Sequence, residues 1–252
     1  MVMNKIVVMS GKGGVGKSTV AANLAFKFAS EGKKVGIFDS DFHGPSIPQM
    51  LGVKEDILGA RDEKNIEPVE VDSNLKVVSM EFLLPDDDSA VIWRGPMKMK
   101  AIKQFVEQVN WGDIDYLIID LPPGTGDEPL SIAQQIPELD GSVIVTTPQE
   151  VAVQAVKKSI SFSEKLDLGV LGVIENMSGL TCPNCGEEIE VFGSGGGKEM
   201  AEKLDVPFLG EIPLDPEIMA SGEEGEPFFG KSAAYSESFE DIVEKLLERL
   251  GE

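Results

Sequence analysis

The chain has 252 residues, of which 42% are hydrophobic and 26% are charged, as is typical of globular proteins. This composition excludes disordered, collagen-like and low-complexity classes. The 44 acidic residues outnumber the 22 basic ones, which sets the formal net charge at −22. Because such a surface repels nucleic acid phosphates and anionic lipids, we expect no nucleic acid partner and no membrane partner.

The cysteine content and the apolar runs indicate where the protein works. Two cysteines in a chain of this length cannot form a disulfide framework, and no apolar run is long enough to span a membrane. The first residues lead through a short apolar run directly into a motif, which is unlike a signal peptide. We therefore expect a reducing, cytoplasmic location.

Short runs rich in Val and Ile alternate with helix-like stretches along most of the chain. The runs are mostly continuous, as expected for strands that are buried on both faces of a parallel sheet. We expect strands at residues 6–9, 35–38, 75–80, 116–121, 143–146, 170–174 and 208–212. We expect helices at residues 17–30, 97–109, 128–135, 151–166 and 197–204. This alternation predicts one α/β domain over residues 1–252, with a doubly wound, mostly parallel sheet and helices on both faces.

Three segments lie outside this alternation. Residues 55–74 are polar and irregular, and we expect an excursion or a long loop there. Residues 180–197 hold both cysteines and a run of glycines, and we expect a loop. Residues 237–250 form an amphipathic helix whose polar face is mostly acidic, whereas a membrane-surface helix is basic. We therefore expect this last helix to dock on the protein.

The first expected strand runs into the sequence GKGGVGKST at residues 11–19. It matches the P-loop pattern G-x-x-x-x-G-K-[ST] between a strand and a helix. Glycines allow backbone N–H groups to face phosphates, and the helix start adds its positive end. Lys17 should reach the β- and γ-phosphates, and the Ser18 hydroxyl should ligate Mg²⁺. The expected phosphate site comprises Gly11, Lys12, Gly13, Gly14, Val15, Gly16, Lys17, Ser18 and Thr19.

Lys12 is a second lysine within this loop. The pattern K-G-G-x-G-K-[ST] resembles the deviant Walker A loop of the family that includes the nitrogenase iron protein, MinD, ParA and the arsenite-pump ATPase. The resemblance implies that Lys12 acts across a dimer interface on the partner's nucleotide. A second cation there would offset charge that develops on the transferred phosphoryl oxygens. The alternative is a solvated loop lysine.

Acidic residues follow two of the expected strands. Asp39 and Asp41 follow the strand at 35–38, and Asp120 comes after four apolar strand residues. The carboxyl ends of parallel strands border the ligand crevice, although such an Asp pair also suits a turn or a helix cap. Asp39 suits the outer shell of Mg²⁺ and Asp41 suits orientation of the attacking water, as the family resemblance supports. Asp120 fits the Walker B pattern, and Gly124 can bring a backbone N–H to the γ-phosphate.

Recognition of the base is weakly encoded. By resemblance to the same family, Asn176 hydrogen-bonds adenine and the region of Pro213 packs on the ring. No guanine-specific N-K-x-D motif is visible in the sequence. We therefore expect ATP rather than GTP, with Lys12, Lys17 and Asp41 as the catalytic residues of an ATPase.

Cys182 and Cys185 form a C-x-x-C turn. It could be a thioredoxin-like redox pair, half a zinc ribbon, or two inert thiols. A redox pair favours a helix N-terminus after a strand, and the adjacent Glu187 and Glu188 should raise the thiol pKa values. A zinc ribbon needs a second C-x-x-C, and this chain has none. Two thiolates cannot complete a Cys₄ centre alone, but two chains can.

An ordered set of motifs resembles the Mrp/ApbC family of iron–sulfur cluster carrier ATPases. The motifs are residues 39–48, 93–97, 111–128, 176–178, 182–185 and 210–216. The resemblance implies a homodimer that hydrolyses ATP slowly, holds a [4Fe–4S] cluster between Cys182 and Cys185 of both chains, and passes it to apo-proteins. Two alternatives remain: a zinc-bridged regulatory ATPase with the metal at the same cysteines, and a positioning ATPase like MinD or ParA.

Overall fold

The computed structural model describes residues 3–42, 44–54, 58–62, 65–83, 95–149, 152–182, 184–226 and 233–251. Within these residues an eight-stranded sheet has the order β12–β9–β8–β1–β7–β2–β6–β5. Its strands are β1 (Asn4–Met9), β2 (Val35–Asp39), β5 (Val69–Glu70), β6 (Leu75–Ser79), β7 (Tyr116–Asp120), β8 (Gly141–Thr146), β9 (Val170–Asn176) and β12 (Phe208–Ile212). All neighbours pair in parallel except β5 with β6. This confirms the mostly parallel α/β sheet, with strand ends shifted by one or two residues from expectation.

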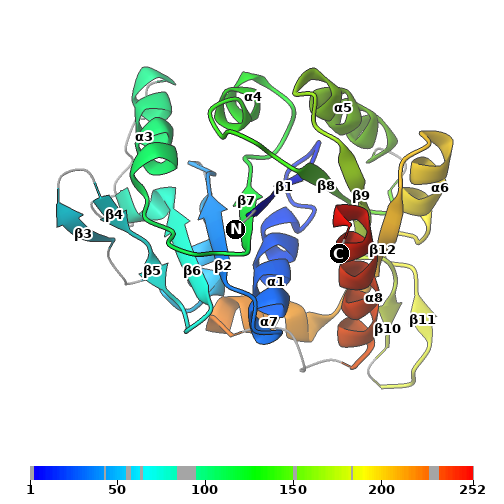
Figure 1. Ribbon diagram of the computed structural model, residues 1–252. Helices are drawn as coiled ribbons and strands as arrows, with labels where there is room; N and C mark the ends of the chain where they lie inside the picture. The colour runs from blue at the N-terminus through cyan, green and yellow to red at the C-terminus, as the bar shows by residue number, and fades with distance from the viewer. Residues whose placement is uncertain are drawn as a thin grey trace.

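Helices cover both faces of the sheet, as predicted (Figure 1). One face carries α1 (Lys17–Ser30) and α8 (Ala233–Leu250), and the other carries α3 (Gly95–Gln108), α4 (Asp127–Ala133), α5 (Ala152–Lys165) and α6 (Gly196–Lys203). Ile6 and Val8 of β1 join the first apolar core, whereas Val7 and Met9 join the second. Because each central strand feeds two cores, its sequence is apolar without alternation.

The strand order brings the predicted acidic residues together. β1 lies between β7 and β8, and the P-loop follows its carboxyl end. In the sheet register, Asp120 of β7 pairs with Val8 of β1 on one side and with Asp39 of β2 on the other. The same edge of the sheet therefore presents the P-loop and both carboxylates.

Residues 55–74 contain short strands that the sequence did not reveal. β3 (Gly59–Asp62) and β4 (Asn65–Glu67) pair in an antiparallel hairpin, and β5 pairs antiparallel with β6. Strands of two to four residues are too short to show a hydrophobic period. Three further elements were also not expected: the short helix α2 (Ile47–Met50), the 3₁₀ turn at Met80–Leu83 and the helix α7 (Pro216–Glu224).

The last helix, α8, docks on the sheet as predicted. Its side chains Phe239, Ile242 and Leu246 are fully buried, and Ile242 lies directly over Gly210 of β12. Its acidic residues remain exposed. Among the described helices, none combines the length and the apolar character that a membrane crossing requires.

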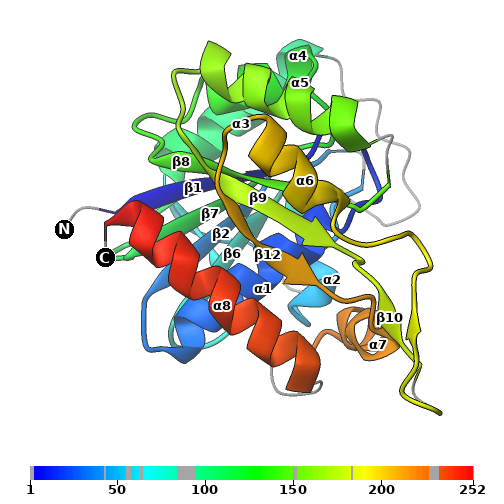
Figure 2. The ribbon, with the colours of Figure 1, turned by 90° about the vertical axis from the view of Figure 1, so that its right-hand side faces the viewer.

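The two cysteines lie on a small hairpin that projects from the main sheet. β10 (Leu180–Thr181) and β11 (Glu188–Ile189) pair antiparallel, and the cysteines occupy the turn between them. Figure 2 shows this hairpin beside α7, extending beyond the end of β9. The chain then returns to the sheet and enters α6.

Candidate functional site

The P-loop lines a cavity of about 240 Å³ at the carboxyl end of β1. Helix α1 begins at Lys17, and within the described structure no side chain caps its N-terminus. Its first N–H groups are therefore available to an anion, which is the arrangement that phosphates prefer. The cavity is lined by Gly13, Gly14, Gly16, Lys17, Ser18 and Thr19 from the loop, and by Asp41 and Ser46 from the β2–α2 connection.

Three side chains form a closed hydrogen-bonded group at the base of this cavity. Lys17 Nζ lies 2.5 Å from Asp120 Oδ1 and 3.3 Å from Ser18 Oγ, and Ser18 Oγ donates to Asp120 Oδ2 at 2.6 Å. Burial raises the pKa of Asp120 above its usual value, and the Lys17 ammonium opposes that shift. Lys17 thus compensates a buried carboxylate until an anion competes for its charge.

Asp39 and Asp41 leave the end of β2 with different surroundings. Asp39 is fully buried, and its carboxylate accepts hydrogen bonds from Ser79 Oγ at 3.0 Å and from the Asp41 N–H at 3.2 Å. Burial, reinforced by the nearby Asp120, raises the pKa of Asp39 to about 7. Asp41 lines the phosphate cavity, and its Oδ1 accepts from the Gly44 N–H at 3.3 Å. Oxygen donors from Ser18, Asp39 and Asp120 fit the preference of Mg²⁺ for hard ligands.

Replacing Asp39 with asparagine should make the stability of the nucleotide-free protein less dependent on pH. With its pKa near 7, the native Asp39 binds a proton that the unfolded chain releases near pH 4. The free energy of unfolding therefore falls as pH rises through this window. Asp39→Asn should gain about 4 kcal/mol near pH 8 but only about 1.5 kcal/mol near pH 5, which urea unfolding in EDTA would measure. Asp113→Asn, at an exposed position, is the control, and an equal gain at both pH values contradicts the assignment.

Gly124 and Lys12 have contacts that bear on their predicted roles. The Gly124 N–H donates to the carbonyl of Ser10 at 2.8 Å, so reaching a γ-phosphate requires this bond to open. Lys12 is exposed, does not line the phosphate cavity, and donates from Nζ to Gln149 Oε1 at 3.2 Å. This exposed position is compatible with action on a partner's nucleotide. Both roles stay predictions.

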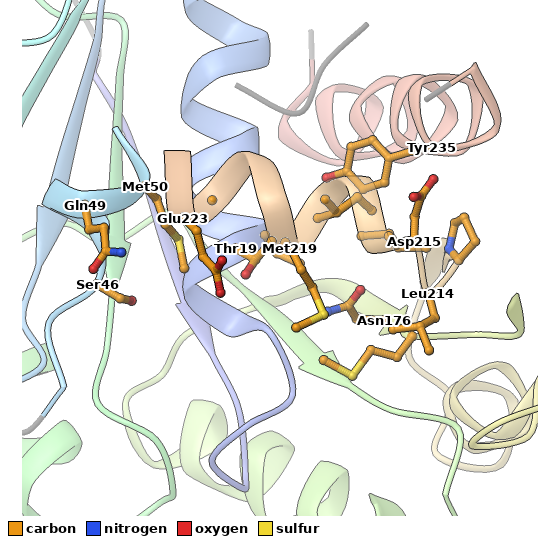
Figure 3. A pocket seen from close by; sticks show the side chains of 16 residues that line it. Thr19, Ser46, Gln49, Met50, Asn176, Leu214, Asp215, Met219, Glu223 and Tyr235 are labelled. Carbon is orange, nitrogen blue, oxygen red and sulfur yellow. The ribbon is translucent and has the colours of Figure 1, made fainter. Parts of the chain in front are cut away.

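A second cavity of about 290 Å³ adjoins the first and shares Thr19, Ser46 and Met50 with it. Figure 3 shows Asn176 and Leu214 on one side of this cavity, Ser46 and Gln49 on the opposite side, and side chains of α7 between them. Pro213, predicted to pack on the base, also lines it. The structure therefore brings the predicted phosphate and base residues into one continuous site.

Asn176 also has a structural contact in this site. Its Nδ2 donates to the Val15 carbonyl of the P-loop at 2.9 Å. Gly16, with φ of 79°, passes so close that a Cβ there would collide with the Asn176 amide. Gly11, the first residue of the predicted phosphate site, packs against the backbone of Ala155 in α5. Met219 and Glu223 of α7 line the base cavity but were missed, because α7 was not expected.

The cysteines are free, with Cys182 partly exposed and Cys185 exposed. Gly186 N–H donates to the Cys182 carbonyl at 2.9 Å, which closes the turn. Backbone N–H groups of Asn184 and Cys185 lower the pKa of the Cys182 thiol. The expectation that neighbouring glutamates raise the thiol pKa was therefore wrong for Cys182, because N–H groups of the turn contact its sulfur.

The position of the cysteines argues against thioredoxin-like chemistry. They sit in a hairpin turn and not at a helix N-terminus. Among the described residues, no group of three or more Cys, His, Asp or Glu side chains could hold a metal ion. One chain therefore offers two thiolates at this turn. The motif residues 43, 93, 94 and 183 lie outside the described part of the chain.

A glycine-rich loop follows the central strand, its lysine and serine contact a strand-end aspartate, and a base cavity adjoins it. Together these features define a P-loop NTPase. The chain belongs to the ParA family: its residues 1–247 match the model described as NUBPL iron-transfer P-loop NTPase. This confirms the relationship that the ordered motifs indicated.

Known relatives cover most of the chain. It is 55% identical over 245 residues to an iron–sulfur cluster carrier protein of Saccharolobus solfataricus, covering 96% of this chain and 82% of the relative. It is 49% identical over 220 residues to the cytosolic Fe–S cluster assembly factor CFD1 of Saccharomyces cerevisiae, covering 85% of this chain and 75% of the relative.

Solved structures show the same fold. A nucleotide-binding protein from Archaeoglobus fulgidus, in complex with ADP, superposes with a TM-score of 0.80 at 43% identity, covering 94% of this chain and 91% of that one. The septum site-determining protein MinD of Pyrococcus horikoshii, in complex with Mg-ADP, gives a TM-score of 0.65 at 23% identity, covering 97% and 96%. At that identity the second likeness shows the fold alone.

Proposed function

We propose that this chain is a carrier ATPase that binds ATP, hydrolyses it slowly, and holds a [4Fe–4S] cluster between two copies for transfer to apo-proteins. The observation that carries the proposal is a pair of free thiols, one partly exposed and one exposed, on a projecting hairpin of a chain that also has a nucleotide site. The relatives named iron–sulfur cluster carrier and Fe–S cluster assembly factor support it.

In this proposal the residues of the nucleotide site have separate roles. Lys17 and the loop N–H groups bind the β- and γ-phosphates, and Asp41 orients the attacking water. Ser18, with Asp39 and Asp120 behind it, would hold Mg²⁺, which neutralises phosphate charge when bound. Asn176 and Pro213 contact the adenine. The described parts of residues 1–252 act as one domain around this site.

The cluster is the cargo, and its four irons need four ligands. Each chain supplies Cys182 and Cys185, so a symmetric homodimer with the hairpins near its two-fold axis completes the set. Ile189, Val191 and Phe192 are large apolar side chains that stay exposed just after the cysteine turn. Exposed apolar side chains gathered in this way are typical of protein interfaces, which supports the pairing of two hairpins.

The acidic charge of the protein bears on its partners and its cellular location. The net charge of −22 and the acidic outer side of α8 disfavour nucleic acid and membrane partners. This counts against a positioning ATPase of the MinD or ParA type. We propose a cytoplasmic location, in keeping with the yeast relative that is named a cytosolic factor.

Anaerobic reconstitution tests the carrier function. Wild-type protein should bind about four irons and four sulfides per dimer and show the broad visible absorption of a cluster. Cys182→Ala and Cys185→Ala should each lose the cluster but keep ATP binding, because the hairpin turn is separate from the phosphate cavity. Asn184→Ala, in the same turn, keeps both thiols and should keep the cluster.

Two outcomes would contradict the bridging model. One is a stable four-iron cluster in a monomeric preparation, and the other is such a cluster in the double cysteine variant. Stoichiometric zinc in a colourless dimer would instead favour the zinc-bridged regulatory ATPase, because Zn²⁺ binds thiolates equally well and does not absorb visible light.

A further inference from the structure

Glu175 is a fully buried carboxylate outside the nucleotide cavities. It lies near the carboxyl end of β9, and both of its oxygens accept backbone hydrogen bonds. Oε1 accepts from the Gly195 N–H at 2.8 Å, and Oε2 accepts from the Gly197 N–H at the start of α6. A buried carboxylate is unfavourable unless its oxygens are satisfied, so this double contact must hold for Glu175 to stay inside.

The glycines that Glu175 holds mark the point where the cysteine-bearing segment returns to the sheet. A Cβ on Gly196 would collide with the Pro148 carbonyl, and a Cβ on Gly197 would meet Glu175 and Thr146. The segment therefore fits closely between the end of β8 and the Glu175 carboxylate. Glu175 fixes this end in place.

The other end of the segment is fixed at the walls of the nucleotide site. Asn176, the next residue after Glu175, binds the P-loop through the Val15 carbonyl. Ser178 N–H donates to the Ile212 carbonyl at 2.9 Å, and Leu214 N–H donates to the Gly179 carbonyl at 2.8 Å. Ile212 and Leu214 line the base cavity, so a movement of these walls would displace residues 178 and 179, just before the hairpin begins.

Two adjacent residues of β9 thus contact the two parts of the chain that the proposed function must connect: Asn176 contacts the P-loop, and Glu175 contacts the cysteine-bearing segment. Adjacent side chains of a strand point to opposite faces, so Asn176 contacts the P-loop while Glu175 contacts the start of α6. A second contact runs in parallel: Gly196 packs on Pro148, and the following Gln149 accepts from Lys12 of the P-loop. The segment that carries the cysteine turn is therefore connected to the P-loop at both of its ends, through residues 176–179 and through residues 195–197.

We propose that Glu175 is a positioning residue that couples the nucleotide state of the P-loop to the cysteine turn. A shift of the P-loop on nucleotide binding moves β9 through Asn176, and Glu175 transmits it to Gly195 and Gly197. The exposure of Cys182 and Cys185 then changes with the nucleotide. The inference rests on the proposed function only in taking these two thiols as the ligands of the cargo.

Thiol alkylation of the metal-free protein tests this coupling without any cluster. Iodoacetamide should label the wild-type cysteines at rates that differ by about fivefold with and without a non-hydrolysable Mg²⁺–ATP analogue. Glu175→Gln keeps the size of the side chain but turns an amide donor toward a backbone N–H. This variant should lose the nucleotide dependence while its affinity for the analogue stays within about threefold. Glu190→Gln, an exposed glutamate of the same segment, should behave as wild type.

Two results would overturn the proposal: wild-type labelling that does not respond to the analogue, or a response that Glu175→Gln retains in full. Should Glu175→Gln fail to fold, hydrogen exchange on the wild-type protein decides. The amides of Gly195 and Gly197 should be protected, and their protection should change with the analogue, whereas unchanged protection overturns the coupling. Because all these measurements use the metal-free chain, a failed cluster reconstitution leaves them standing.

Discussion

Lys17→Ala should abolish the binding of Mg²⁺–ATP, whereas Asp41→Ala should leave binding nearly intact and slow hydrolysis. Lys17 is the buried cation at the base of the phosphate cavity, so its removal deletes the main charge facing the β- and γ-phosphates. We expect the dissociation constant to rise by about 10³-fold, or about 4 kcal/mol. Asp41 lines the same cavity. Because its carboxylate repels phosphate but accepts a hydrogen bond from water, its loss should lower kcat by about 10²-fold.

Calorimetric titration with a non-hydrolysable Mg²⁺–ATP analogue and steady-state phosphate release separate the two effects. Lys103→Ala, which removes an exposed lysine from α3, controls for the change in net charge. Lys17→Gln controls for folding, because its amide can still donate to Asp120 when the ammonium is gone. Equal loss of binding in the Lys17 and Asp41 variants would show that the two residues do not have separate roles.

Much of the phosphate site could be predicted because parallel strands end at one edge of a sheet. A P-loop after the first strand and aspartates after two others had to converge once the sheet was parallel. The register that pairs Asp39 with Asp120 bears this out. Asn176 and Pro213 came from family resemblance, and the structure adds that Asn176 also binds the P-loop itself.

Features that depend on three-dimensional neighbours could not be predicted. The nine-residue segment that becomes α7 has no clear apolar period, so Met219 and Glu223 gave no signal of a base cavity. A glutamate such as Glu175 at the end of an apolar strand is expected to be exposed. Only the fold shows that two backbone N–H groups satisfy it inside the protein.

The pKa of the Cys182 thiol also could not be predicted from the residue types around it. Two glutamates after Cys185 suggested a raised thiol pKa, because like charges disfavour a thiolate. The turn instead directs the N–H groups of Asn184 and Cys185 at the Cys182 sulfur, and its pKa is lowered. The direction of a backbone N–H is set by turn geometry, which residue types alone do not specify.

Lys12→Ala should lower hydrolysis by about 10²-fold or more while nucleotide binding by an isolated chain changes little. A cation supplied to the transferred phosphoryl group stabilises the transition state more than the bound nucleotide. In this structure Lys12 does not line its own phosphate cavity and donates to Gln149, which is compatible with the predicted action on a partner's nucleotide. Phosphate release at saturating ATP measures the rate, and titration with Mg²⁺–ADP measures the binding.

Mixing two inactive variants tests whether Lys12 acts across the dimer. When Lys12→Ala is mixed with Asp41→Ala, a mixed dimer has one complete site, in which the Lys12→Ala chain contributes Asp41 and its partner contributes Lys12. At equal mixing about half of the dimers are mixed, so about one quarter of the wild-type rate should return. The matched control mixes Lys12→Ala with the Lys12→Ala/Asp41→Ala double variant, where no chain supplies Lys12 and no rate should return. If mixed dimers form and the first mixture stays inactive at every ratio, Lys12 does not act in trans.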